Sequence, residues 1–362
     1  MVEFAYIHIP FCRQKCKYCA FTSFVNLNLI DKYIDALCQE IEYFYQKEPL
    51  KTIYFGGGTP SLLSISQIEK VISKFNFQNN PEITLELNPE SGNTEYLKEL
   101  KAHGVNRLSI GCQTFNNEIL SEIGRCHTTN ESLQAIKNAR IAGFNNISID
   151  LMYGLPHQTI ENLKNDLKII KSNSIEHIST YGLKIEAKTY YSKYMPENLP
   201  DEELQAKMYE IIIDELKDYT HYEISNFAKD NNYKSKHNLN YWNLNPYYGF
   251  GVSASGFVDN KRYKNTEIIK HYINNPHEKE EELTMDENGL LEEEIFLGFR
   301  KMDGINIRQI NKKYGINFDK KYENIIKKYT ETGHIIKTDN GYKLSLSGVL
   351  ISNYILCDFL ML

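Results

Sequence analysis

The sequence alternates, six times between Phe4 and about Tyr181, between a short apolar run and a longer segment with helical spacing. Loops rich in Gly, Pro or Asn separate these segments. The predicted strands are Phe4–Ile9, Thr52–Phe55, Ile83–Leu87, Arg107–Ile110, Asn146–Met152 and His177–Tyr181. Strands that alternate with helices have right-handed crossovers and form a parallel sheet. An α/β fold is therefore expected, with either an open doubly wound sheet or a partial barrel.

Two of the predicted helices have local signals of their own. Residues 30–45 carry apolar side chains at helical spacing, and Ser66 with Glu69 resembles a capping box that opens the next helix. In both candidate folds, ligands bind at the carboxyl ends of the strands. The unusual residues at or just after predicted strand ends are Cys12, Gly56, Glu86, Gln113 and Asp150. A site is therefore expected at that edge of the sheet.

Beyond residue 200 the pattern of predicted elements and the composition change. Residues 200–227 indicate a helix and then a strand, and residues 236–257 indicate a loop dense in aromatic residues and glycine. From about Glu278 the composition turns acidic, and Asp339-Asn340-Gly341 between two alternating runs signals a hairpin. We predict a core barrel at 1–235, a connection at 236–277 and a small winged-helix-like domain at 278–362.

Charge and apolar content limit the classes of function. No stretch approaches the roughly 20 apolar residues of a membrane-spanning helix, and residues 1–9 lack the features of a signal peptide. The net charge is -6, so nothing global attracts nucleic acid. Seven cysteines, three of them within residues 12–19, suit a metal site in a reducing compartment better than disulfides. These features predict a cytoplasmic chain with no nucleic-acid partner.

Cys12, Cys16 and Cys19 form a Cys-x3-Cys-x2-Cys loop that is short enough to wrap one iron–sulfur cubane. A 4Fe-4S cluster usually takes four cysteines, so three would leave one iron free for another ligand. A zinc site or chance spacing would explain the same pattern. Zinc would need a fourth Cys or His close by, and His8 lies back within the preceding strand. The spacing favours the cluster and resembles the signature of radical-SAM enzymes.

Later strand ends carry further candidates. Gly56-Gly57-Gly58-Thr59-Pro60 follows a strand directly, so its backbone can approach a ligand with free N–H groups, although such a run is more often a tight turn. Glu86, Gln113, Arg125 and Asp150 lie at or beyond otherwise apolar strands. Each of these alone could cap a helix or face solvent. Grouped at the carboxyl ends of neighbouring strands, these four side chains favour recognition of a nucleoside–amino-acid ligand.

Six motifs lie between Tyr6 and Pro156. They are Tyr6-Ile-His-Ile-Pro-Phe-Cys12, Gly56-Gly-Gly-Thr-Pro-Ser61, Glu86-Leu-Asn-Pro89, Arg107-Leu-Ser-Ile-Gly-Cys-Gln113, Gly124-Arg-Cys-His127 and Asp150-Leu-Met-Tyr-Gly-Leu-Pro156. They resemble the radical-SAM family of anaerobic coproporphyrinogen dehydrogenases and, within it, heme chaperones of the HemW type. The resemblance implies a TIM-like partial (β/α)6 radical-SAM barrel with an accessory C-terminal domain.

The same resemblance implies roles for individual residues. Cys12, Cys16 and Cys19 would hold the 4Fe-4S cluster, with Tyr18 against it. The S-adenosylmethionine site would be lined by Tyr6, Gly57, Gly58, Thr59, Glu86, Gln113, Arg125 and Asp150. The free iron would chelate the amino and carboxylate groups of the methionine moiety, and an electron from the cluster could then cleave the sulfonium.

Three features separate the two branches of this family. The dehydrogenases carry a fourth cysteine where this chain has Phe21, and an N-terminal extension where it has a few residues before Tyr6. His237-Asn-Leu-Asn-Tyr241-Trp242 resembles the HNxxYW motif associated with heme in the chaperones. A neutral imidazole is a good axial ligand of heme iron, and Tyr and Trp rings can stack on the macrocycle. His237 could equally be a structural loop histidine hydrogen-bonded to backbone.

One departure concerns the segment after this motif. Residues 249–256 read Gly-Phe-Gly-Val-Ser-Ala-Ser-Gly, whereas the family has a histidine near the end of this segment. A second axial ligand from this segment is therefore not expected.

Three functions follow as hypotheses. The first is a heme chaperone that delivers heme to apo-hemoproteins, among them respiratory membrane enzymes, which would bring it to the periphery of the membrane. The second is an oxygen-independent coproporphyrinogen III oxidase that makes protoporphyrinogen by radical decarboxylation. The third is a radical-SAM enzyme acting on tRNA or a peptide, and the negative charge argues against tRNA. Whether the protein is an enzyme stays open at this point, as does the formation of a homodimer.

Overall fold

The computed structural model describes residues 1–360 and places nine strands in one sheet, in the order β7-β8-β6-β5-β4-β3-β2-β1-β9. The bounds are β1 (Phe4–Ile9), β2 (Leu50–Gly57), β3 (Phe77–Leu87), β4 (Arg107–Gln113), β5 (Ile147–Tyr153), β6 (His177–Gly182), β7 (Thr220–Glu223), β8 (Asn226–Ala228) and β9 (Tyr248–Phe250). Strands β1 to β6 pair in parallel and in chain order. A singly wound order curls into a partial barrel, whereas a doubly wound sheet reverses its order midway. The parallel α/β prediction is confirmed in its barrel form.

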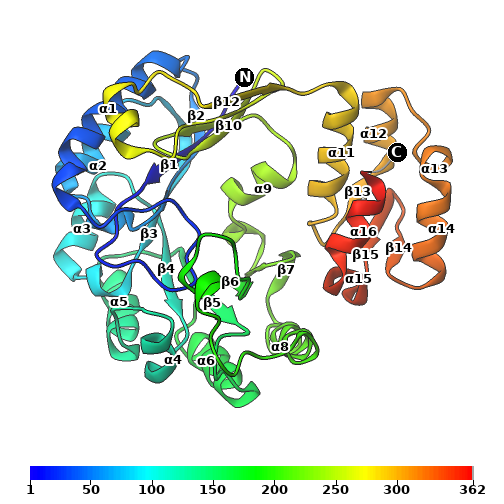
Figure 1. Ribbon diagram of the computed structural model, residues 1–362, viewed down its shortest axis with the longest axis horizontal. Helices are drawn as coiled ribbons and strands as arrows, with labels where there is room; N and C mark the ends of the chain where they lie inside the picture. Colours follow the sequence, from blue (N-terminus) through cyan, green and yellow to red (C-terminus); the bar gives the residue numbers. More distant parts are fainter. Residues whose placement is uncertain (361–362) are drawn as a thin grey trace.

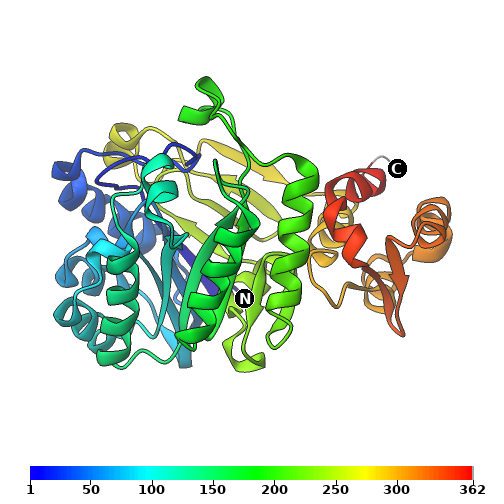
Figure 2. The ribbon, with the colours of Figure 1, turned by 90° about the horizontal axis from the view of Figure 1, so that it is seen from below.

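Helices cover the outside of the curved sheet (Figures 1 and 2). They are α1 (Ile30–Phe44), α2 (Ile65–Ile72), α3 (Thr94–Ala102), α4 (Asn117–Glu122), α5 (Thr129–Ile141), α6 (Ile160–Ser172) and α8 (Glu202–Glu215). The short helix α7 (Tyr190–Lys193) lies instead beyond the strand ends (Figure 2), where the Tyr191 N–H donates to Lys17 O at 3.1 Å. Helices α5 and α6 open on capping boxes at Thr128 and Thr159. Helix α2 also has a capping box, but it is formed by Ser64 and Gln67. The predicted box of Ser66 and Glu69 is therefore wrong by two residues.

The two faces of the strands differ in polarity. Outward side chains such as Ile53, Leu85 and Leu108 are fully or nearly fully buried and pack in the apolar core beneath the helices. The alternate side chains face the inside of the barrel, and many of them are polar, as at Glu86 and Ser109. A barrel lined with polar groups is built to surround a ligand rather than to fill its own interior.

Residues 236–257 are not the loop that the sequence predicts. Ser235 caps a short helix, α9 (Lys236–Trp242), by accepting a hydrogen bond from the Asn238 N–H. The chain then forms β9, which pairs in parallel with β1 at the edge of the sheet. Helix α9 packs against β2 on one side and the C-terminal domain on the other (Figure 1). A second sheet follows, made of β10 (Ser255–Val258), β11 (Lys261–Lys264) and β12 (Glu281–Thr284), with α10 (Ile269–Asn274).

The C-terminal domain has its own apolar core around Ile295, Phe318 and Phe359. Its elements are α11 (Glu287–Gly298), β13 (Ile305–Asn306), α12 (Ile307–Tyr314), α13 (Phe318–Lys321), α14 (Glu323–Glu331), β14 (Ile335–Lys337), β15 (Gly341–Leu344), α15 (Leu346–Leu350) and α16 (Ser352–Phe359). Strands β14 and β15 form an antiparallel hairpin, as Asp339-Asn340-Gly341 predicts. The exact domain boundaries remain a prediction.

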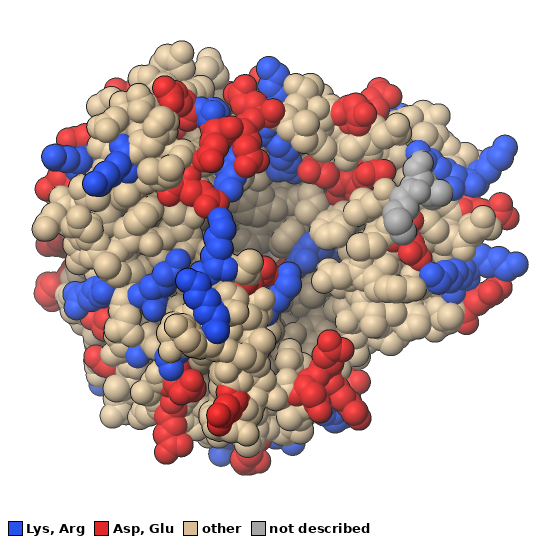
Figure 3. All heavy atoms as spheres, viewed as in Figure 1, with Lys and Arg blue, Asp and Glu red and all other residues tan. Residues whose placement is uncertain are grey.

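Between the barrel and the C-terminal domain, the face seen in Figure 3 is hollowed, and acidic and basic side chains are interspersed around it. Among residues 1–360, no helix has both the length and the apolar character to span a membrane.

Candidate functional site: a cavity at the mouth of the barrel

A cavity of about 500 Å³ lies at the carboxyl ends of the parallel strands. Eleven of the predicted site residues line it: Cys12, Cys16, Tyr18, Cys19, Gly57, Gly58, Thr59, Glu86, Gln113, Arg125 and Asp150. Most come from the loop after β1 and from the carboxyl-terminal parts of β2 to β5, whereas Arg125 lies in the loop between α4 and α5. The structure therefore brings together residues that are up to 138 positions apart in the chain.

The cysteine loop is held against the rim by backbone hydrogen bonds, from Cys12 N–H to Phe24 O at 3.0 Å and from Lys17 N–H to Ile123 O at 3.1 Å. All three thiols are free. Thr59 Oγ1 donates to Cys12 Sγ at 3.6 Å, and Arg125 Nη1 donates to Cys16 Sγ at 3.7 Å. Burial raises the pKa of Cys12, and it raises that of Cys19 to about 11. Soft sulfur ligands in such a buried place favour a bound metal group over free thiolates.

The spacing of these ligands separates a cluster from a single ion. In residues 1–360, no three His, Cys, Asp or Glu side chains come close enough together to hold one metal ion. A zinc ion needs its ligands to converge on one point, whereas each cysteine of a cubane binds a different iron. Three sulfur donors that face one cavity without converging on one point fit a 4Fe-4S cluster better than a single zinc ion.

Two glycines allow the end of β2 to lie against the cysteine loop. A Cβ on Gly58 would come within 2.7 Å of Phe11 O and 3.0 Å of Cys12 Sγ, and Gly57 has a φ of +114°. The N–H groups of Gly57 and Gly58 were expected to be free for a ligand, but both donate hydrogen bonds within the protein. Gly57 N–H donates to Glu86 Oε2 at 3.1 Å, and Gly58 N–H donates to Ile9 O at 2.8 Å.

Two buried carboxyl groups face the cavity, and within residues 1–360 neither forms a salt bridge, although the charge of Arg107 lowers the pKa of each. Glu86 accepts from Tyr54 OH at 2.9 Å, and burial together with the charge of Asp150 raises its pKa to about 7. Asp150 accepts from Ser109 Oγ at 3.0 Å, and burial raises its pKa. A ligand with ammonium, sulfonium or hydroxyl groups would stabilise the ionised forms. This donor set fits S-adenosylmethionine.

Arg125 and Gln113 close the far side of the cavity. Arg125 Nη2 donates to Asn88 Oδ1 at 2.9 Å and to Gly111 O at 2.7 Å, which fixes the guanidinium beside Cys16. Gln113 ends β4 at a register shift and adopts a φ of +65°. Such a conformation costs roughly 1–3 kcal/mol in a residue other than glycine, so the surrounding structure must impose it.

Several lining residues were not assigned from the sequence, among them Tyr54, Asn88, Ser109 and Tyr181. Tyr54 and Ser109 alternate with core residues on predicted strands, so strand parity could have found them. Tyr6, in contrast, lies outside the cavity lining. Its hydroxyl hydrogen-bonds His8 Nδ1 at 3.0 Å.

The residues predicted to bind heme are on α9 and do not line this cavity, although the His237 ring stacks behind Tyr54, with 5.1 Å between the ring centres. His237 is 1% exposed, with Nδ1 2.7 Å from Thr52 Oγ1 and Nε2 2.8 Å from Tyr241 OH. Burial, with a smaller effect from Arg107, lowers the pKa of His237 to about 3. His237 is thus a neutral imidazole whose two nitrogens are both occupied in this arrangement.

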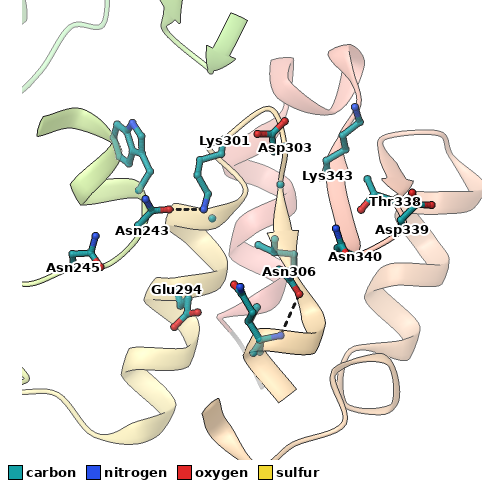
Figure 4. Close-up of a pocket in the computed structure, with 16 residues that line it drawn as sticks. Asn243, Asn245, Glu294, Lys301, Asp303, Asn306, Thr338, Asp339, Asn340 and Lys343 are labelled. Atoms are coloured by element: carbon teal, nitrogen blue, oxygen red, sulfur yellow. Dashed lines mark hydrogen bonds between the residues drawn. The ribbon is translucent and has the colours of Figure 1, made fainter. Parts of the chain in front are cut away.

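Trp242 lines a second cavity, of about 730 Å³, between α9 and the C-terminal domain. The Arg300 guanidinium lies 4.5 Å from the indole. Figure 4 shows Lys301 reaching across this cavity to Asn243, where Nζ donates to Oδ1 at 2.7 Å. Of the three predicted heme residues, Trp242 alone lines one of the two cavities described here.

Comparison with known proteins defines the class. Residues 6–170 match the family model of the Radical SAM superfamily, and residues 285–351 match that of the HemN C-terminal domain. The solved structure of coproporphyrinogen III oxidase (HemN) from Escherichia coli superposes with a TM-score of 0.87 at 22% identity, covering 99% of this chain and 90% of that one. The fold is therefore a radical-SAM barrel followed by a HemN-type C-terminal domain.

Relatives of higher identity define the family. Heme chaperone HemW of Bacillus subtilis is 39% identical, covering 98% of both chains, and that of Lactococcus lactis is 39% identical, covering 94% of both. Heme chaperone HemW of Buchnera aphidicola (subsp. Schizaphis graminum) is 35% identical over 98% of this chain and 97% of its own. The chain belongs to the HemW heme chaperone family.

Proposed function

We propose that this protein is a heme chaperone that binds heme and delivers it to apo-hemoproteins, respiratory membrane enzymes among them. The observation that carries the proposal is the similarity to heme chaperones along nearly the entire length of both chains. The chain would work in the cytoplasm and meet membrane-bound recipients at the membrane periphery.

The proposal includes two resident cofactors at the mouth of the barrel. Cys12, Cys16 and Cys19 hold a 4Fe-4S cluster, and the cavity beside it holds S-adenosylmethionine. When bound, the pair supplies an electron donor next to a reducible sulfonium. Thr59 and Arg125 stabilise the sulfur ligands, while Glu86 and Asp150 offer acceptors to the cofactor's amine and hydroxyl groups. Tyr18 and Phe21 line the cluster side of the cavity.

The alternative activity, oxidative decarboxylation of coproporphyrinogen III, is proposed to be absent. Phe21 stands where that branch carries a fourth cysteine, and it is 65% exposed beside the cavity. An anaerobic assay with coproporphyrinogen, reductant and S-adenosylmethionine separates the two functions. Protoporphyrinogen as product would refute a chaperone-only role.

Heme is proposed to bind through α9. Ligation of iron by His237 requires the Tyr241 hydroxyl, four residues along the same helix, to rotate away from Nε2. Because His237 is also buried against β2, a shift of α9 must expose the ring before iron can reach it. Trp242 then packs on the macrocycle from its cavity against the C-terminal domain. A heme titration of wild type and His237→Ala tests the ligand, and equal affinities would remove His237 from the site.

One sample tests the whole proposal. After anaerobic reconstitution we expect close to four irons per chain, an EPR signal that changes when S-adenosylmethionine is added, and transfer of bound heme to an apo-hemoprotein. Cys12→Ala should lose the cluster, whereas Cys126→Ala, at an exposed cysteine outside the triad, should keep it. Reconstituted protein that carries heme but cannot pass it to any apo-hemoprotein would contradict the chaperone function.

A further inference from the structure

Arg107 begins β4 and lies one layer below the cavity. Ser109 and Gly111, which follow it on the same face of the strand, both line the cavity, whereas Leu108 and Ile110 pack in the outer core. The neighbouring strand places Thr84 directly opposite Arg107. Both side chains therefore face the interior of the barrel, below the layer of Glu86 and Ser109.

Both of these interior groups are buried without partners. Arg107 is 2% exposed, and Thr84 is completely buried. Within the described part of the chain, neither Arg107 Nε nor Thr84 Oγ1 has a hydrogen-bond partner, and no carboxylate pairs with this guanidinium. Two other arginines, Arg140 and Arg262, do pair with glutamates, at 2.9 and 2.6 Å. A buried cation without a partner is strongly unfavourable, so a missing anion is the simplest account.

The acidic groups that face Arg107 from the layer above are committed elsewhere. Glu86 accepts hydrogen bonds from Tyr54 OH and the Gly57 N–H, and Asp150 accepts from Ser109 Oγ. Each carboxylate is held in its own strand layer by these bonds. Neither can turn down to Arg107 without leaving its donors unpaired.

The histidines below do not supply an anion or a competing cation. His177 is hydrogen-bonded at both nitrogens, to Ser148 Oγ and Tyr222 OH, each at 2.8 Å. His237 is also bonded at both nitrogens. Burial and the charge of Arg107 lower the pKa of both rings, which are therefore neutral. Glu82, which precedes Thr84 by two residues on the same face of β3, is also buried, but its carboxylate accepts hydrogen bonds from the N–H groups of Lys236 and His237 at 3.3 and 3.2 Å. Arg107 and Thr84 are therefore the groups of this region that are left to bind a ligand.

We propose that Arg107 and Thr84 form a binding site for the carboxylate of an organic acid that enters through the cavity. The planar guanidinium fork matches a carboxylate bidentately, and the Thr84 hydroxyl can donate a third hydrogen bond. A dianionic phosphate fits less well because Glu86 and Asp150 lie in the next layer up. This site is separate from the proposed heme chemistry and does not depend on it.

The test measures propionate binding to the full-length, cluster-reconstituted protein by thermal shift, with sodium chloride at equal ionic strength as the reference. Wild type should show saturable stabilisation by propionate. Arg107→Lys keeps the charge but loses the fork, and should weaken binding at least tenfold. Thr84→Val should weaken it several-fold. Arg140→Lys, which changes an arginine paired with Glu176, is the matched control and should bind like wild type.

Three outcomes would overturn the proposal: a response that does not saturate, equal affinity in wild type and Arg107→Lys, or inorganic phosphate binding as tightly as propionate. If Arg107→Lys fails to fold, Thr84→Val decides the test alone, and wild-type affinity in that variant counts against the site. A crystal grown with formate gives an independent reading. Planar density within hydrogen-bond distance of the guanidinium supports the proposal, and water alone at that position refutes it.

Discussion

His237 is stabilised in its neutral form, and this has a measurable consequence for acid stability. Its pKa is about 3 in the folded protein and near 6.5 when unfolded, so its stabilising contribution is complete above pH 6.5 and declines as the pH falls towards 3. In His237→Gln this dependence is absent. We expect the difference in unfolding free energy between wild type and variant to shrink by roughly 2 kcal/mol from pH 7 to pH 5. Urea unfolding at both pH values measures it, and a constant difference would contradict the neutral imidazole.

Tyr241 competes with heme iron for the same nitrogen of His237. Its hydroxyl lies 2.8 Å from Nε2, and Tyr241→Phe removes that partner while keeping the ring. If His237 ligates heme, the variant should bind heme several-fold more tightly, because one hydrogen bond of about 1 kcal/mol no longer has to break. A heme titration followed by the Soret band measures this. Unchanged or weaker binding would argue that iron is held elsewhere.

Gly58 sets the distance between β2 and the cysteine loop. In Gly58→Ala the new methyl group would meet Phe11 O at 2.7 Å and Cys12 Sγ at 3.0 Å, so the loop must move. We expect the variant to fold but to retain less than half the iron of wild type after reconstitution. Gly289→Ala is the matched control, because its methyl group would meet only side-chain atoms of Met285 and Asp286. Full iron content in Gly58→Ala would show that the loop tolerates the displacement.

At the scale of elements, α1 is joined to the segment after β9 by a buried carboxylate. Glu40 accepts from the Gly251 N–H at 2.8 Å, from Tyr272 OH at 2.6 Å and from Lys279 Nζ at 2.6 Å. Glu40→Ala would leave Lys279 charged and unpaired, and should lower the unfolding free energy by about 3–5 kcal/mol. Glu42 lies on the same helix as Glu40 but forms a solvent-accessible ion pair, with Lys74 beyond α2. Glu42→Ala should lower the unfolding free energy by about 1 kcal/mol or less. Denaturant titrations compare the two, and equal losses would contradict this ranking.

The order of strands and helices could be predicted because β1 to β6 carry strong apolar runs between Gly- and Asn-rich loops. Helix α9 was missed because it has only seven residues and includes aromatic and asparagine side chains of modest helix propensity. Its helical form depends on the Ser235 cap and on burial of His237 against β2. Tertiary contacts of this kind have no local signature in the sequence.

The candidate site was more predictable than the fold of α9. Most of its residues follow strand ends, and parallel strands bring those ends together whatever the loop lengths. The hydrogen-bond and ion partners of these side chains could not be predicted from the sequence. The hydrogen bond from the Gly57 N–H to Glu86 depends on side-chain geometry between strands that are distant in sequence. So does the absence, within residues 1–360, of a hydrogen-bond partner for Arg107 Nε.

At the scale of the whole molecule, the barrel and the C-terminal domain are joined by backbone as well as side chains. The Ile224 N–H donates to Arg300 O at 3.0 Å, and the Met302 N–H donates to Tyr222 O at 3.1 Å. Trp242, the only tryptophan, lies at this junction beneath Arg300. We expect tryptophan fluorescence and far-UV circular dichroism to report the same denaturant midpoint, since the two units should unfold together. Separate midpoints would show that the domains unfold independently.

Helix α9 contacts both β2 and α11, so the barrel and the C-terminal domain hold it in place together. A ligand that requires α9 to move must break both sets of contacts. The free energy of breaking them reduces the affinity for that ligand. The coupling between the two sites is reciprocal. If ligand binding changes the affinity for a recipient protein that draws the C-terminal domain away, binding of that recipient changes the ligand affinity by the same factor. Release could then be triggered by the recipient's own docking, with no expenditure of chemical fuel.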